Sequence, residues 1–266
     1  MDSPVASTAL PGSGTIWPRL PQRERLILLA ALAAITALSW LYLVRMPMVP
    51  ADLGAAGARL LSVLPPRLAS IWLIFMMWSV MMVAMMLPSA SSMILTYAAM
   101  VHRHPGSSAY APWIFASAYF VIWTLFSAAA TAGQLVLENA SLLYGASRTT
   151  SVVGAILLML AGLYQLTPFK NSCLAHCRSP LGFFMTEWRN GLTGAFTMGI
   201  KHGAHCLGCC WMLMGLLFVF GAMNLIWVAA LSVLVLLEKL APFGHTIARI
   251  SGVVMLAGAI ALAVHR

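Results

Sequence analysis

The chain has 266 residues, of which 61% are hydrophobic and only 8% are charged, against about 25% charged residues in an average soluble domain. This composition excludes an ordinary soluble globular protein. Its mean hydropathy of +0.91 is spread over several separate apolar stretches, which indicates a helical membrane protein because a backbone in lipid must satisfy its own hydrogen bonds. The formal charge of +9 fits basic residues that set membrane topology, so we predict no nucleic-acid partner.

Apolar runs of about 20 residues predict an all-α, polytopic transmembrane helical bundle of about seven spans, with six as the alternative. Residues 1–24 are polar and rich in Pro, Gly and Ser, which predicts a disordered cytoplasmic tail, and residues 25–266 form a single transmembrane domain. Residues 191–204 are mixed in character and could instead form an interfacial or re-entrant segment. The spans are predicted at residues 26–44, 70–100, 111–137, 151–166, 191–220, 223–237 and 248–264.

The second predicted span contains a proline. Pro88 is expected to kink or break this helix and to leave carbonyl groups near Ala84 without their usual donors. Lys and Arg are more frequent on one side of the predicted spans, which favours a cytoplasmic amino terminus and a cytoplasmic loop between the fourth and fifth spans.

Methionines crowd residues 76–93. Helical spacing brings Met81 and Met85 onto one face with Met86 beside them. Thioether sulfur is a soft ligand that selects Cu(I) over hard ions, so we predict that these three methionines bind metal. The alternative is that methionine simply fills apolar interfaces. The full set in this stretch is Met76, Met77, Met81, Met82, Met85, Met86 and Met93.

A second motif lies in the predicted loop that contains residues 173–177. Cys173, His176 and Cys177 could close around one metal ion on a turn or a helix end, and the adjacent Lys170 and Arg178 would favour the thiolates that this requires. The alternative is a reduced thiol pair without a function.

The third motif, residues 198–214, carries the other three cysteines. His202, Cys206 and Cys210 recur at intervals of four, between Met198 and Met214 at the same interval, and His205 and Cys209 form a second such pair. On a helix these side chains form one soft-ligand stripe, beside which Lys201 would supply positive charge. Gly203 and Gly208 would allow close helix approach. The alternative is small buried cysteines that pack between helices, with histidines at the membrane interface.

Several features outside the three motifs bear on the predicted chemistry. All five cysteines fall in one stretch, which argues against a disulfide framework. Glu238 and Lys239 end a predicted span, where an interfacial salt bridge is favoured over a proton or metal role for the glutamate. Tryptophans such as Trp40 are interpreted as aromatic-belt anchors. Phosphate-binding loops, a nucleophile elbow and paired carboxylates are missing from the sequence, so we predict that the protein is not an enzyme.

Four ordered motifs resemble those of a known family. AMMLPSAS, GLYQLTPFKNSCLAHCRSP, HCLGCCWMLM and GAMNLIW are similar to motifs of predicted metal-binding integral membrane proteins of bacteria, part of which resembles a membrane copper chaperone associated with a polyphenol oxidase. The resemblance covers about residues 72–240 and implies copper handling at the bacterial cytoplasmic membrane. It marks Met85, Met86, Pro88, Lys170, Cys173, Cys177, Cys206, Cys209 and Cys210.

Three functions follow as hypotheses. The first is a membrane copper chaperone that handles Cu(I) for cuproenzyme maturation or copper homeostasis, with membrane lipids around it and a cuproenzyme or soluble copper carrier as partner. The second is a transmembrane thiol–disulfide electron relay, but adjacent Cys209 and Cys210 would form a strained disulfide and the methionines would have no role. The third is a permease for zinc or mercuric ion. The sequence predicts no oligomeric state.

Overall fold

The computed structural model describes residues 21–45, 65–102, 108–140, 143–144, 148–149, 151–221 and 224–264. These residues are helical apart from turns and two short strands, β1 (Leu143–Tyr144) and β2 (Arg148–Thr149), which pair antiparallel. The helices are α1 (Gln22–Arg45), α3 (Pro66–Val101), α4 (Ala111–Asn139), α5 (Ser151–Gln165), α6 (Pro168–Arg178), α7 (Pro180–Glu187), α8 (Gly191–Gly215), α9 (Leu217–Phe220), α10 (Leu225–Leu240) and α11 (Gly244–Val264).

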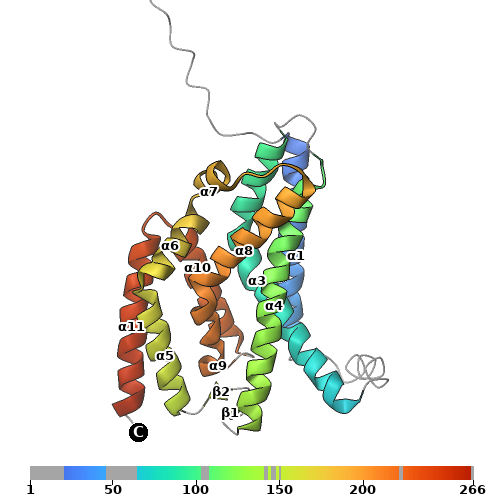
Figure 1. Cartoon of the computed structure of the whole chain (residues 1–266). Helices are drawn as coiled ribbons and strands as arrows, with labels where there is room; N and C mark the ends of the chain where they lie inside the picture. The colour runs from blue at the N-terminus through green and yellow to red at the C-terminus, as the bar shows by residue number, and fades with distance from the viewer. Residues whose placement is uncertain are drawn as a thin grey trace, which may run out of the picture.

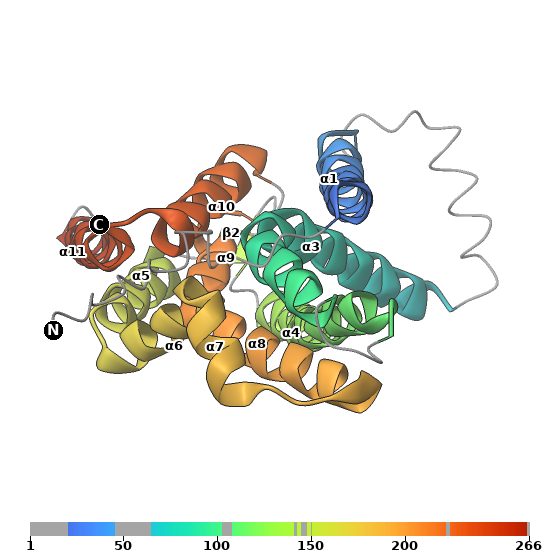
Figure 2. The same cartoon turned by 90° about the horizontal axis from the view of Figure 1, so that it is seen from above.

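The helices form a bundle with two sides, each built from a different group of helices. Helices α1, α3, α4 and α8 pack in succession on one side, α5 packs on α11 on the other, and α6 lies against α8 (Figure 1). Seen from above, α11 lies at the left edge and α1 at the upper edge, where it packs on α3 (Figure 2). Large apolar side chains remain exposed on the outer helices, for example Leu26 at 65% and Val254 at 64%. Such surfaces suit contact with lipid rather than water.

The prediction of a helical bundle is confirmed, and several of its helices suit a membrane span, but the predicted count of seven spans is not reached among the described residues. Five helices are long and apolar enough to cross a membrane, or six if α5 and α6 count as one span bent by 64°. The predicted span 223–237 corresponds to α10, whose 16 residues extend only about 24 Å, shorter than a hydrocarbon core of about 30 Å.

Two local predictions about the amino-terminal half are modified. Residues 1–20 of the predicted tail lie outside the described residues, and its last residues belong to α1, which begins at Gln22. Helix α3 runs through Pro88 without breaking. The carbonyl oxygen of Ala84, which loses its helical donor to Pro88, instead accepts a hydrogen bond of 3.1 Å from Nε1 of Trp40. Trp40 thus has a hydrogen-bond partner on a neighbouring helix, and its predicted place in an aromatic belt stays a prediction.

Helix α8 is continuous from residue 191, so its first half is not a separate re-entrant segment. The prediction that two glycines allow close helix approach is confirmed. A Cβ at Gly203 would lie 2.9 Å from the side chain of Ile122 on α4, and one at Gly208 would lie 2.9 Å from Sγ of Cys173 on α6. Helix α8 thus packs closely against both α4 and α6 at these glycines.

One end of the bundle carries α6, α7 and the start of α1 (Figure 1). His102, after the end of α3, lies 3.4 Å from Glu24 of α1. The rings of Tyr97 on α3 and Trp188 after α7 lie 5.9 Å apart. The segment between α5 and α8 therefore lies at the same end as the start of α1.

Candidate metal centre

The second sequence motif is a helix, not a loop. Thr167 caps α6 by accepting a hydrogen bond from the backbone N–H of Lys170, and Pro168 occupies the first turn, where its missing N–H costs nothing. The chain therefore turns sharply between α5 and α6. Cys173 and Cys177, four residues apart on one face, are both 8% exposed and lie on the side that packs on α8. Sγ of Cys173 lies only 2.9 Å from where a Cβ at Gly208 of α8 would be.

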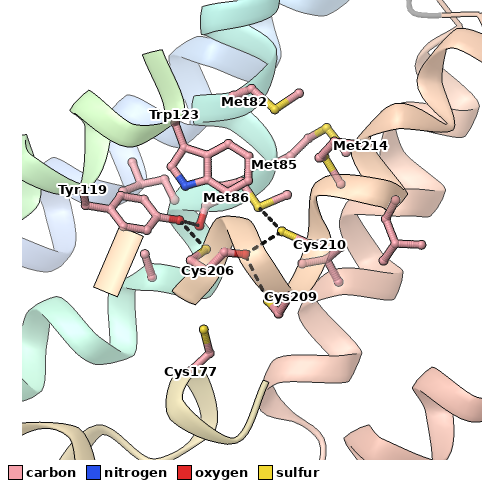
Figure 3. Packing of buried hydrophobic residues seen from close by; sticks show 14 of the residues in the cluster. Met82, Met85, Met86, Tyr119, Trp123, Cys177, Cys206, Cys209, Cys210 and Met214 are labelled. Atoms are coloured by element: carbon pink, nitrogen blue, oxygen red, sulfur yellow. Dashed lines mark hydrogen bonds between the residues drawn. The ribbon is translucent and has the colours of Figure 1, made fainter. Parts of the chain in front are cut away.

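The third motif places its three cysteines inside the bundle. Cys206, Cys209 and Cys210 are each 1% exposed, and all are free thiols. The thiols of Cys209 and Cys210 donate to the carbonyl oxygen of Cys206 at 3.1 and 3.0 Å. Cys177 on α6 lies across from them (Figure 3). The five cysteines of the sequence therefore gather where α6 meets α8.

Methionines of α3 close the opposite side of this cluster. The Sγ atom of Cys210 lies 3.8 Å from Sδ of Met86, 124 residues away in the chain. Met82, Met85 and Met214 lie on the same side (Figure 3), and the predicted ligands Met81, Met85 and Met86 are all buried. Two sulfur ligands bonded at about 2.3 Å to one ion lie about 3.8–4.0 Å apart in trigonal or tetrahedral geometry. The Cys210–Met86 separation therefore fits a shared metal ion.

A buried lysine supplies the positive charge at the cluster, but it is not the one that the sequence pattern indicated. Nζ of Lys239 lies 3.0 Å from Sγ of Cys206. The predicted donor of charge, Lys201, instead forms a salt bridge with Glu187 at the surface. Sequence reasoning missed Lys239 because it lies on a different helix, 33 residues beyond Cys206. The available signal was its position at the end of an apolar helix, where a lysine is costly unless it has a function or a partner.

The two basic residues beside the second motif also have other partners. Lys170 forms a fully buried salt bridge of 2.7 Å with Glu238, so the predicted Glu238 salt bridge exists but lies inside the protein rather than at an interface. Arg178 donates to the backbone carbonyls of Glu238 and Pro242 at 3.1 and 2.8 Å. Neither cation is free to stabilise a thiolate of Cys173 or Cys177, so that part of the prediction is wrong.

His202 is a buried imidazole without a hydrogen-bond partner. It is 3% exposed, and neither Nδ1 nor Nε2 has a hydrogen-bond partner in the described structure. Its ring stacks on those of Phe115 and Tyr119 at 5.9 and 5.4 Å. The hydroxyl of Tyr119 in turn lies 3.1 Å from Sγ of Cys206 (Figure 3). Buried polar groups almost always have hydrogen-bond partners. The ring nitrogens of His202, one turn before Cys206, have none, which suits a residue that binds a metal ion when the cluster takes one up.

The other two predicted histidines form a pair near the surface. The rings of His176 on α6 and His205 on α8 stack with centroids 4.5 Å apart. In each, Nδ1 hydrogen-bonds at 2.8 Å to a carbonyl of its own helix, Ser172 for His176 and Lys201 for His205. A ring nitrogen held in this way leaves Nε2 as the free metal-binding atom. His176 is exposed and His205 is half-buried, and the next residue after each is a cysteine of the cluster.

The donors of the three motifs suit a soft ion of low coordination number. Among the described residues, no group of three or more His, Cys, Asp or Glu side chains is already arranged to hold a metal ion. A closed three- or four-ligand zinc site is thus not preformed in this part of the chain. Thiols and a thioether in pairs, by contrast, are the ligand types that select Cu(I).

The fold and the buried cluster define a class: a helical bundle with several helices apolar enough to span a membrane, and with cysteine and methionine side chains gathered from three helices. A sequence model of the copper chaperone family PpoB2 matches residues 75–262, which include all three motifs. The chain belongs to this copper chaperone family, which confirms the resemblance drawn from the motifs and indicates a copper-handling role. No curated protein and no solved structure matches the chain.

Proposed function

We propose that this protein is a membrane copper chaperone that binds Cu(I) in the sulfur cluster between α3, α6 and α8 and passes it on for cuproenzyme maturation or copper homeostasis. The observation that carries the proposal is the contact of Cys210 with Met86 at 3.8 Å beside two further buried cysteines. Soft sulfur donors in low-coordinate arrangements favour Cu(I) and allow handover from one ligand pair to the next.

The positions of the donors suggest a route. The half-exposed pair of His176 and His205 would receive the ion from a soluble copper carrier, and the cysteines would hold it. Met85 and Met86, buried on the far side of the cluster, would offer thioethers for its onward transfer. Each step exchanges one or two ligands, so no site along the route has to bind the ion so tightly that it cannot leave.

We further propose that the amino terminus and the α6–α7 end face the cytoplasm of a bacterial cell, with the bundle in the cytoplasmic membrane. Two observations support this orientation: the start of α1 lies at the same end of the bundle as α6 and α7 (Figure 1), and the predicted cytoplasmic segments are rich in Lys and Arg. The histidine pair would then receive copper from the cytoplasmic side. The proposed role is binding and transfer, without catalysis.

The test is anaerobic metal analysis of the detergent-purified full-length chain after growth in copper. We expect about one or more Cu(I) per chain in the unmodified protein, by the low-coordinate sulfur chemistry of Cu(I), and its loss from the variant with Cys206, Cys209 and Cys210 all changed to Ser. Met93→Leu, a buried change on α3 outside the predicted ligand set, serves as the matched control and should keep the copper.

Two outcomes would overturn the proposal. Copper-free protein whose thiols titrate reversibly with a redox buffer would favour the electron relay. Protein that retains zinc in preference to copper after growth with both would favour the permease. Helicity and thermal unfolding of the cysteine variant, compared with the unmodified chain, verify that copper is not lost through misfolding.

A further inference from the structure

Lys239 is a buried cation beside the sulfur cluster. Its side chain is 5% exposed. Nζ donates to Sγ of Cys206 at 3.0 Å and to Oγ of Ser89 at 3.2 Å. Ser89 in turn donates to the carbonyl oxygen of Met86 at 2.9 Å, so the lysine reaches both a cysteine of α8 and the backbone of a predicted methionine ligand on α3.

The carboxylates that the structure describes all have partners elsewhere. Glu24 contacts His102, Glu187 contacts Lys201, Glu238 contacts Lys170, and Glu138 accepts from Gln134. A buried charge is stable only when an opposite charge or several hydrogen bonds compensate it. Of the groups that contact Lys239, the Cys206 sulfur is the one that can become an anion.

The geometry points to Lys239 as a specificity-determining residue: a fixed positive charge that makes the cysteine site selective for monovalent soft metal ions. This inference rests on the proposed function and deepens it. Two thiolates, one ammonium group and one Cu(I) ion sum to zero charge. The same two thiolates with a divalent ion would leave an excess positive charge inside the bundle, where uncompensated charge is costly.

Removal of the positive charge of Lys239 should shift the preference of the site from monovalent toward divalent soft metal ions. In Lys239→Met, two thiolates carry a net charge of −2, which a divalent ion neutralises and a monovalent ion does not. Lys239→Arg keeps the charge, so it should restore selectivity. Lys201→Met removes one positive charge from α8 at a residue that pairs with Glu187 instead of the cluster, which makes it the matched control.

The test compares Ag(I) with Cd(II), two soft ions of the same electron count that differ in charge, together with Cu(I) itself. Each binds anaerobically to the purified full-length protein against a competing chelator of known affinity. We expect Lys239→Met to lower the ratio of Ag(I) to Cd(II) affinity at least tenfold and to weaken Cu(I) in parallel. Lys239→Arg should stay within about threefold of the unmodified ratio and Lys201→Met should leave it unchanged, since charge at a few ångströms dominates these differences.

An unchanged affinity ratio in a folded Lys239→Met would overturn the inference, even if the chain binds Cu(I) normally. If the unmodified chain does not bind Cu(I), the proposed function itself fails, so the two failures are distinguishable. Lys239→Gln, which is neutral but can still donate to Ser89, keeps the test decisive if the methionine variant does not fold. Equal loss of all three ions in both neutral variants would assign Lys239 a purely structural role.

Discussion

Two buried lysines, Lys170 and Lys239, lie in the same bundle but have different surroundings. Lys170 is fully buried and bonded to the carboxylate of Glu238 at 2.7 Å, and Gln165 donates to the other carboxylate oxygen at 2.8 Å. Lys239 lies next to Glu238 in the chain, yet its ammonium group points to Cys206. Consecutive residues of α10 therefore serve two separate polar networks.

The different partners of the two lysines indicate different roles. Lys170 holds helices together, whereas Lys239 serves the candidate metal site. The Lys170–Glu238 pair joins α6 to α10, and the carboxylate of Glu238 accepts hydrogen bonds from both Lys170 and Gln165. Lys239 has a sulfur atom where a structural pair would have a carboxylate, and sulfur is also what the proposed metal ion needs. A buried cation whose natural partner is a potential metal ligand indicates function, while one with a dedicated carboxylate indicates structure.

The strongest test of this comparison removes one member of each network. Glu238→Gln leaves Lys170 buried without its counter-ion, so we expect a loss of about 3–5 kcal/mol in the free energy of unfolding. Lys239→Met leaves no charge behind, because Cys206 can stay a neutral thiol, and the metal-free protein should be as stable as the unmodified one. Thermal unfolding of both variants in detergent measures the contrast.

A double change provides the control for this stability prediction. Lys170→Met with Glu238→Met removes both charges and should recover most of the stability that Glu238→Gln loses, since apolar replacements of a buried pair are often neutral. Equal stability of Glu238→Gln and the unmodified chain would contradict a structural role for the pair.

The second prediction concerns the methionine side of the cluster. Met86→Leu keeps the volume of the buried side chain but removes the thioether 3.8 Å from Cys210. We expect Cu(I) affinity to fall about tenfold, roughly 1.4 kcal/mol, with little change in stability because the exchange of Met for Leu conserves volume. Competition with a Cu(I) chelator measures it. Met93→Leu on the same helix is the control, and an equal loss in both variants would remove Met86 from the ligand set.

The sequence pattern anticipated the cluster better than it anticipated the spans. Intervals of four residues correctly put Cys206 and Cys210 on one face of a helix, because helical periodicity is local. The same logic misplaced the charge: Lys201 is near the cysteines in sequence, but only the packing of α10 brings Lys239 to Cys206. The contact of Met86 with Cys210 likewise depends on packing across 124 residues, which no local spacing encodes.

The number of spans was harder to predict for a related reason. An apolar run is compatible with a full span or with a shorter buried helix, and only tertiary packing decides between them. In the predicted span 151–166, residues 151–165 form the 15-residue α5, after which Pro168 starts α6 at a bend of 64°. The segment after the bend, predicted to be a loop, is helix α6, and it places Cys173 and Cys177 against α8.

The third prediction separates access to the site from retention in it. His176 and His205 lie outside the buried cluster and present free Nε2 atoms. Changing both to Ala should slow Cu(I) loading from a weak chelator by severalfold and leave the final copper content unchanged. Stopped-flow absorbance or fluorescence measures the rate, and metal analysis measures the content. Lower copper content at equilibrium would instead make the pair part of the retaining site.

The smallest effect is expected for a third lysine, Lys201, which pairs with Glu187 at the surface. Its hydrogen bond lowers the pKa of the Glu187 carboxyl. The pair therefore contributes stability above the usual glutamate pKa of about 4.3, and this contribution disappears as pH falls through the lowered folded-state pKa. Both side chains are about one-third exposed, so Glu187→Gln should cost less than about 1 kcal/mol at neutral pH and nothing in strong acid. Thermal unfolding across this pH range measures the difference, and a cost as large as that of Glu238→Gln would show that burial does not separate the lysines of this bundle.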